Sequence, residues 1–404
     1  MTQAIDRAGT SFAGKVSRVP AAAGARLPGI DRMRGLVIVL MALDHVRDFF
    51  NVDALHFDPT DLARTYPALF LTRFVTHYCA PTFVFLAGVS AFLHGTKCDD
   101  RWPLARYLLT RGVWLILLDA IVVSPIWALR LGSIDLGTLW AIGFSMIVLA
   151  GLVWLQPRAV LLLGALILLG HNLLDSVHAS EFGDWAVFWN ILHEQGALPF
   201  GLRGAVAYPV FPWIGIMAMG YGLGHIFLEP ATQRERHLKL LGLVSITLFL
   251  LLRGWNLYGD PRPWSAQGSG VMTALSVLNV TKYPPSLLYA LVTLGPALLL
   301  LSAMERLGGF AGEVLATFGR VPLFIYVLHL YAARAAAVAL SLAEGFDFHQ
   351  LRGFGIQEAP PEGLGLSLGG TYAAWILIMA ALYPACRWFA SVKRRRRDWW
   401  LSYL

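Results

Sequence analysis

The sequence predicts an all-α, polytopic transmembrane helical bundle of about ten spans, with both termini in the cytosol. Of its 404 residues, 57% are hydrophobic and only 14% are charged, whereas about 25% are charged in soluble domains. Apolar stretches of about 20 residues, the length that a bilayer requires, recur along the chain. The basic residues also fall mostly on one side of these stretches. A soluble enzyme, a collagen, a disordered chain and a disulfide scaffold are therefore excluded.

The ten expected helical spans follow from the apolar stretches and from the polar segments that separate them. They are placed to within several residues at each end. The expected spans are 34–50, 70–95, 104–127, 136–155, 158–175, 208–228, 237–256, 285–304, 319–342 and 367–390. Because their number is even, both termini lie on one side of the membrane.

The basic residues orient this bundle. If the termini are cytosolic, cytosolic loops and tails hold 22 of the 32 lysines and arginines, as the positive-inside rule requires of a protein in the inner (plasma) membrane. Residues 1–29 contain no apolar run, so we interpret them as a disordered basic arm and not as a signal peptide. Residues 30–390 form the membrane domain, and 391–404 form a basic tail. Its run Lys393–Arg397 indicates contact with anionic lipid and not with nucleic acid.

Two further features bear on function. Cys79, Cys98 and Cys386 are far apart and match no metal-ligand spacing, so we expect neither a disulfide nor a metal site. Four outward connections are long and contain many Gly, Pro, Asp, His or aromatic residues, which indicates a recognition surface on the outer face. These connections are about 51–69, 176–207, 257–284 and 343–366.

The most informative segment is Asp44-His45-Val46-Arg47-Asp48, within the first span. His45 lies roughly 16 Å along the helix from Arg34, near the middle of the hydrocarbon layer. Ionisable groups at this depth need a partner or a wet cavity, and they usually mark function. Helical spacing lets Asp44 meet Arg47, and lets Asp48 meet either Asp44 or His45. The alternative interpretation is a polar cluster that only holds helices together.

Other polar side chains enter the second and ninth spans. Arg73 and His77 share a face of the second span, and Pro81 can kink this helix to open a cavity beside them. Tyr326 and His329 lie three residues apart in the ninth span. The remaining candidates for substrate binding are Arg34 and Arg320 at the cytosolic ends of the first and ninth spans, and His56 in the first outer loop. Each also has a structural interpretation, as an interfacial, packing or surface residue.

Five segments together resemble a bacterial branch of the heparan-alpha-glucosaminide N-acetyltransferase family. They are Ile30–Gly35, Met41–Arg47, Phe57–Leu62, Thr72–Ser90 and Gly319–Leu330. The resemblance implies a ten- or eleven-helix transmembrane acyltransferase that moves an acetyl group from cytosolic acetyl-CoA to a sugar amine or hydroxyl across the membrane. It also implies kinship with membrane O-acetylases, and it does not fix the acceptor.

Two histidines then compete for the role of general base. The catalytic histidine of the lysosomal family member follows the first span where this sequence has His56, and that member has an amide at the position of His45. We favour His45, because it is buried and flanked by carboxylates. Imidazole suits this task near neutral pH, and Asp48 or Asp44 would hold its tautomer.

The other parts of this hypothesis concern the oxyanion and the donor. Arg73, His77 and Tyr326 are candidate donors to the oxyanion. Cytosolic cations would bind the phosphates of CoA. The candidates are Arg101, Arg106, Arg111, Arg234, Arg236 and Lys239.

Two other functions use similar residues. In a secondary transporter for an anionic or sugar-like solute, His and Asp at mid-membrane would form a proton relay. Against this alternative, the sequence lacks paired Gly/Pro-interrupted spans in corresponding halves. A membrane glycosyltransferase would need acidic metal ligands in an outer loop, and Asp53, Asp58 and Asp61 are the candidates.

Overall fold

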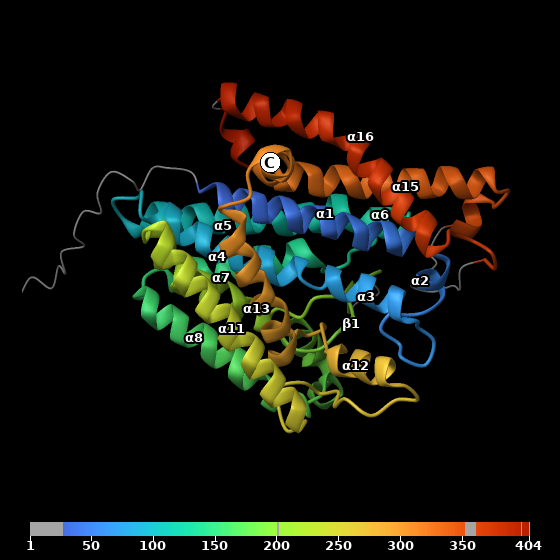
Figure 1. The fold of residues 1–404 in the computed structure, drawn as a ribbon, viewed down its shortest axis with the longest axis horizontal. Helices are drawn as coiled ribbons and strands as arrows, with labels where there is room; N and C mark the ends of the chain where they lie inside the picture. The colour runs from blue at the N-terminus through green and yellow to red at the C-terminus, as the bar shows by residue number, and fades with distance from the viewer. Residues whose placement is uncertain (1–26, 200–201, 352–360, 397, 404) are drawn as a thin grey trace, which may run out of the picture.

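A computed structural model describes residues 27–199, 202–351, 361–396 and 398–403, and it is a bundle of helices (Figure 1). Within these residues, eight helical segments are long and apolar enough to cross a membrane. They are Pro67–Gly95, Arg101–Trp127, Pro157–Leu174, Phe211–Leu228, Ala231–Trp255, Leu287–Met304, Pro322–Ala343 and Leu368–Arg395. The predicted all-α multi-pass bundle is therefore confirmed.

The two other predicted spans are also helices, but they do not meet the same criteria. α1 (Pro28–Phe50) carries Asp31, Arg32, Arg34, Asp44, Arg47 and Asp48 along its length. α7 (Thr138–Leu152) has only 15 residues. The predicted arm lies almost wholly outside the described residues, while the last helix continues to Arg395, five residues into the predicted tail.

Several of the eight segments contain more than one helix. The remaining bounds are α3 (Pro67–Thr76), α4 (Cys79–Gly95), α5 (Arg101–Leu118), η2 (Asp119–Val123), α6 (Ser124–Ala128), α8 (Pro157–Gly170), η3 (His171–Leu174), α10 (Phe211–Gly222), η5 (Leu223–Leu228), α11 (Ala231–Trp255), α13 (Leu287–Met304), α14 (Gly309–Arg320), α15 (Pro322–Ala343) and α16 (Leu368–Arg395). η2 is a π-helix, and η3 and η5 are 3₁₀ helices.

The long connections that the sequence predicts contain short elements of their own. These elements are α2 (Val52–His56), η4 (Ala179–Trp185), α9 (Ala186–Leu192), β1 (Gly196–Ala197), β2 (Ala205–Val206), α12 (Gly270–Leu278) and η6 (Phe348–Leu351), and η7 (Trp399–Tyr403) follows α16. β1 and β2 pair antiparallel. The connections thus have defined local structure.

The bundle has two chemically different ends, which we name by their contents. At the basic end α1 begins and α16 finishes (Figure 1). Arg32 ties this end together by donating to the carbonyls of Met304 and Glu305, at 2.9 and 3.0 Å. At the opposite, loop end, Asn279 donates to the carbonyl of Thr60 at 2.9 Å. The long connections meet at this loop end.

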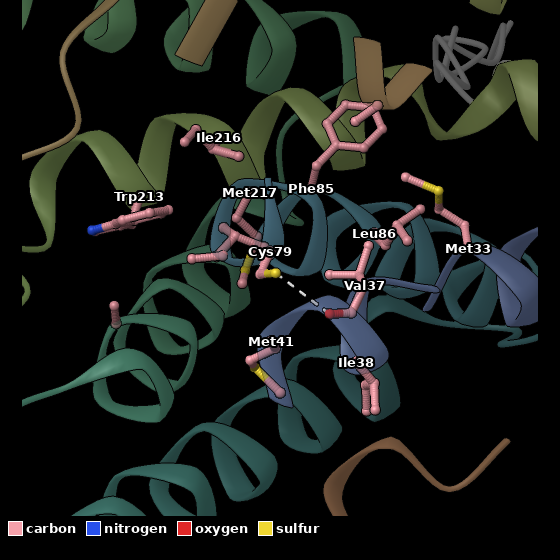
Figure 2. Packing of buried hydrophobic residues seen from close by; sticks show 14 of the residues in the cluster. Met33, Val37, Ile38, Met41, Cys79, Phe85, Leu86, Trp213, Ile216 and Met217 are labelled. Atoms are coloured by element: carbon pink, nitrogen blue, oxygen red, sulfur yellow. Dashed lines mark hydrogen bonds between the residues drawn. The ribbon is translucent and has the colours of Figure 1, made fainter. Parts of the chain in front are cut away.

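α1 lies near the centre of the bundle, and most of its residues are buried. Figure 2 shows its apolar side chains, including Val37 and Met41, beside α4, which packs in turn against α10. Cys79 of α4 donates its thiol to the carbonyl of Val37 at 3.4 Å. A helix that is surrounded by protein can carry ionisable side chains, because those side chains face other helices and not lipid.

The second and ninth predicted spans each include a junction between two helices. The second is interrupted at His77–Tyr78, between α3 and α4, one turn before Pro81. Pro81 lies in the first turn of α4, where its missing N–H removes no helical hydrogen bond. The ninth expected span matches α15 and also takes in the last two residues of α14, because α14 ends at Arg320 and α15 begins at Pro322. Pro322 fits the first turn of a helix and disfavours continuation of the helix before it.

Gly35→Ala is expected to destabilise the contact between α1 and α14. A Cβ at this position would overlap the carbonyl oxygen of Leu315, and backbone cannot move aside as a side chain can. We expect a loss of roughly 1–3 kcal/mol or more, seen as a lower Tm in detergent. Gly151→Ala is the control, because a Cβ there meets nothing within 4 Å. This control should raise the Tm slightly, and an equal loss in both variants would contradict the prediction.

Candidate functional site

Two cavities of about 420 and 370 Å³ lie within the bundle, in the size range of small-molecule sites. The larger, the loop-side cavity, contains His45. The smaller, the basic-end cavity, has Arg34, Arg111, Arg320 and Lys393 in its lining. Thr138 and Tyr326 line both cavities. The two cavities therefore lie back to back across these side chains.

The loop-side cavity is built mainly from α1, the bent α5–η2–α6 segment and the loop-end connections. Its wall contains both aromatic and polar side chains. Its lining includes Asp44, His45, Asp48, Arg73, Asp119, Trp127, Asp135, Thr138, Tyr208, Tyr283 and Tyr326. Such a wall suits a polar ligand with flat or apolar faces.

His45 has a histidine as its partner. Its Nδ1 lies 2.8 Å from Nε2 of His329, and Nδ1 of His329 lies 2.8 Å from the carbonyl oxygen of Ile325. A carbonyl only accepts, so Nδ1 of His329 carries the proton and Nε2 of neutral His329 accepts. His45 must then donate from Nδ1. In this neutral state Nε2 of His45 keeps its lone pair, and it has no hydrogen-bond partner among the described residues.

The carboxylate of Asp44 is held by cations and not by the imidazole. Arg73 donates to both of its oxygens at 2.8 Å, and Arg47 lies 2.7 Å from it. Thr76 also donates to Asp44. The predicted contact of Asp44 with Arg47 is therefore confirmed. The long-range partner Arg73 comes from α3.

Asp48 is likewise occupied by Arg47, which donates to it at 2.5 Å. The Arg47 side chain is fully buried between its two acids. The expectation that Asp44 or Asp48 fixes the tautomer of His45 is thus not met, since His329 makes that hydrogen bond. Both acids still line the loop-side cavity. Their charges are balanced by Arg47 and Arg73.

Asp119 is a site residue that the sequence analysis missed. It begins the π-helix η2, is buried, and accepts from the backbone N–H groups of Gly137 and Trp140 at 2.9 and 2.8 Å. It thereby caps the start of α7 and fixes Thr138 at the junction of the cavities. An acid in an otherwise apolar span was the signal available. A single π-turn inside a helix often marks a functional site.

Tyr208 and Tyr283 form a further part of the cavity wall that sequence reasoning missed, and Lys282 lies against both of their rings. The Nζ of Lys282 lies 5.0 Å from the ring of Tyr283 and 5.8 Å from that of Tyr208. Burial acts to raise the pKa of Tyr283, but Lys282 and Arg73 outweigh it and lower the pKa below its usual value. A more acidic phenol is a stronger hydrogen-bond donor. Tyr283 can therefore donate to a ligand oxygen in this cavity.

Two predicted site residues lie elsewhere. His77 packs against Phe74 and Tyr289, with ring centroids 6.4 and 5.5 Å away, and it lines neither cavity. The ring of His56 engages the carbonyl of Val52 at 2.8 Å. Its neighbour Leu55 lines the loop-side cavity, whereas His56 does not. His56 therefore lies beside this cavity without lining it.

The basic-end cavity is lined by a different set of cations from the one predicted for CoA. Of the six predicted residues, only Arg111 lines it. Arg101 instead donates to the carbonyl of Leu155 at 2.8 Å, and Arg234 pairs with Glu305 at 2.7 Å. Arg34 and Arg320, the candidates for substrate binding at the cytosolic helix ends, both line the cavity. Arg34 donates to Ser90 there.

The fold and the cavities define a multi-pass membrane protein that holds polar groups in its interior. Residues 26–258, more than half of the chain, match the family model described as heparan-alpha-glucosaminide N-acetyltransferase, catalytic. The chain belongs to this family, as its motifs indicated, and is thus a transmembrane acetyltransferase by class. No curated protein matches the chain.

Proposed function

We propose that the chain transfers an acetyl group from acetyl-CoA in the basic-end cavity to a sugar or glycan acceptor in the loop-side cavity, with His45 as general base. The observation that carries this proposal is the pair of cavities that share Thr138 and Tyr326. A donor and an acceptor that enter from opposite ends would meet at these two side chains. A pocket that opens at only one end could not receive the donor from one compartment and the acceptor from the other.

The basic-end cavity has the chemistry of a CoA site. Its inner wall is apolar and includes Ile38, Leu115 and Met146, which suits the thin pantetheine arm. Its cations can pair with phosphates, and arginine can do so through two parallel hydrogen bonds. Little water would reach the thioester along such a wall, which limits hydrolysis.

The transfer then needs one base and one oxyanion donor. Nε2 of His45 removes the proton of the acceptor hydroxyl or amine as the acceptor attacks the acetyl carbonyl. The C–S bond of the thioester breaks, CoA leaves as a thiolate, and the proton from His45 returns to the leaving group or to water. Tyr326 is the proposed donor to the oxyanion. His329 is a positioning residue, because it touches His45 and no cavity.

The proposed orientation of the protein in the membrane follows from the positive charge at the basic end. The basic end carries Arg34, Arg111 and the last turn of α16, with Lys393, Arg394 and Arg395. The positive-inside rule places such an end in the cytosol, where acetyl-CoA is made available. The acceptor then approaches from outside an inner (plasma) membrane. Trp127 and the cavity tyrosines offer ring faces against which a sugar can pack.

The test uses purified protein in liposomes with radiolabelled acetyl-CoA and an extract of cell-envelope glycans. We expect label on a glycan and one free CoA for each acetyl group transferred. Solute movement without consumption of acetyl-CoA would instead support the secondary transporter. Neither label on an acceptor nor release of CoA would contradict the acetyltransferase.

Removing a cation of the basic-end cavity should weaken donor binding selectively. For Arg320→Ala we expect KM for acetyl-CoA to rise about tenfold with kcat nearly unchanged, because a phosphate contact contributes about 1.5–3 kcal/mol at most and acts equally before and in the transition state. Arg320 already pairs with Glu313 at 2.7 Å, so its contact with a phosphate should contribute less than this maximum.

The matched control is Arg236→Ala, because Arg236 belongs to the same end of the bundle but does not line the cavity. Its kinetic constants for acetyl-CoA should stay at the wild-type values. Equal KM values in Arg320→Ala and wild type would place the phosphates elsewhere.

A further inference from the structure

We infer that His171, Asp175 and His193 form a binding site for a divalent transition-metal ion, with Zn²⁺ as the best match, at the loop end of the bundle. One ligand atom from each residue lies within 4.8 Å of those of the other two. His171 begins η3 at the end of α8, Asp175 follows η3, and His193 follows α9. The site is separate from both cavities and does not depend on the proposed function.

The state of His171 is the second, independent observation. Its side chain is buried, with 1% of its surface exposed, and neither ring nitrogen has a hydrogen-bond partner within the part of the chain that the structure describes. A buried imidazole without partners carries the full penalty of lost hydration. A metal ion bound to one nitrogen would remove this penalty. The ring faces His193, with centroids 5.6 Å apart.

The other two proposed ligands, Asp175 and His193, already lie close to the positions that coordination of one ion requires. Asn172 donates to Oδ2 of Asp175 at 2.8 Å, which leaves Oδ1 for the metal. This Oδ1 lies 3.8 Å from Nε2 of His193. Two ligand atoms on one tetrahedral Zn²⁺ at 2.0–2.2 Å lie roughly 3.4 Å apart, so small side-chain movements suffice. A hydrogen bond to a ligating carboxylate is the usual outer-shell arrangement around a metal.

Binding changes one existing contact. Nε2 of His193 now lies 2.9 Å from the carbonyl oxygen of His171, so in the neutral ring its proton is on Nε2. On binding, this proton moves to Nδ1 and the lone pair of Nε2 goes to the metal. Two imidazoles and one carboxylate are a ligand set for Zn²⁺ that leaves a fourth position for water. The same set suits other borderline ions more weakly.

The ion would fasten the connection between α8 and α10 to the bundle. Asn172 accepts from the N–H of Leu287 at the start of α13, at 2.9 Å. At the end of the connection next to α10, the N–H of Val210 donates to the carbonyl of Ile191 in α9, at 2.8 Å. Tyr208, which lines the loop-side cavity, lies in this connection. The proposed metal is therefore structural, and it steadies one wall of the cavity.

The test uses the full-length protein in detergent, purified with an affinity tag that contains no histidines. A chelator first removes any bound metal, and ZnCl₂ is then titrated into the protein by calorimetry. We expect one Zn²⁺ per chain, a higher Tm on binding, and visible absorption of a tetrahedral ion when Co²⁺ replaces Zn²⁺. Asp175→Asn keeps the size of the side chain and should weaken Zn²⁺ binding by at least about tenfold. His193→Gln is the second variant and should do the same.

His178→Ala is the matched control, because His178 lies in the same connection with 59% of its side chain exposed and is not a proposed ligand. It should bind Zn²⁺ as the wild type does. Failure of the wild type to take up one Zn²⁺ per chain would overturn the proposal, whatever the variants do. Equal affinity in wild type and a folded Asp175→Asn or His193→Gln would overturn it as well.

Discussion

His45→Ala is expected to lower acetyl transfer by about 10²–10⁴-fold, the usual contribution of a positioned general base. The imidazole lines the loop-side cavity, and its Nδ1 is engaged by His329, so Nε2 is the nitrogen left for the acceptor. Turnover of labelled acetyl-CoA in liposomes measures the effect. KM for acetyl-CoA should change little, because His45 does not line the basic-end cavity.

The comparison variant is His56→Ala, which removes the other candidate base. The His56 ring already contacts the carbonyl of Val52, so we expect a much smaller effect than in His45→Ala. The Tm of both variants in detergent reports whether the fold is kept. Wild-type turnover in His45→Ala together with loss of turnover in His56→Ala would transfer the role of base to His56.

Asp44→Ala is expected to cost about 3–5 kcal/mol of folding free energy, because it leaves buried positive charge without a partner. Arg47 and Arg73 both pair with this carboxylate, and Arg47 has no exposed surface. Asp48 can neutralise only one of them. A large fall in Tm, or failure to purify a monodisperse protein, is the measured result.

Glu313→Ala is the matched control for this loss, since it breaks a single pair with Arg320 in which 61% of the Glu313 side chain is exposed. Exposed pairs contribute about 0–1 kcal/mol, so its Tm should stay close to that of the wild type. If Asp44→Ala unfolded no more readily than Glu313→Ala, the buried charges would not depend on one another as the distances indicate.

Local properties of the chain were enough to predict most of the architecture. Hydropathy over windows of about 20 residues located helices at all ten expected spans, because a bilayer imposes this length on every helix that crosses it. The depth of the Asp44–Asp48 segment marked it as the polar centre. The three-residue spacing of Asp44 and Arg47 also predicted their ion pair, because such residues face each other on one helix.

Only the tertiary structure decided which groups meet across the bundle. His45 and His329 are 284 residues apart, and Arg73 reaches Asp44 from a different helix. Helical periodicity gives the faces of one helix, but it carries no information on which distant helix packs against each face. For the same reason, helical spacing predicted a carboxylate partner for His45, and five of the six cations expected to bind phosphate do not line the basic-end cavity. The sequence therefore determined where polar groups enter the membrane, and the packing of the helices determined what each of them contacts.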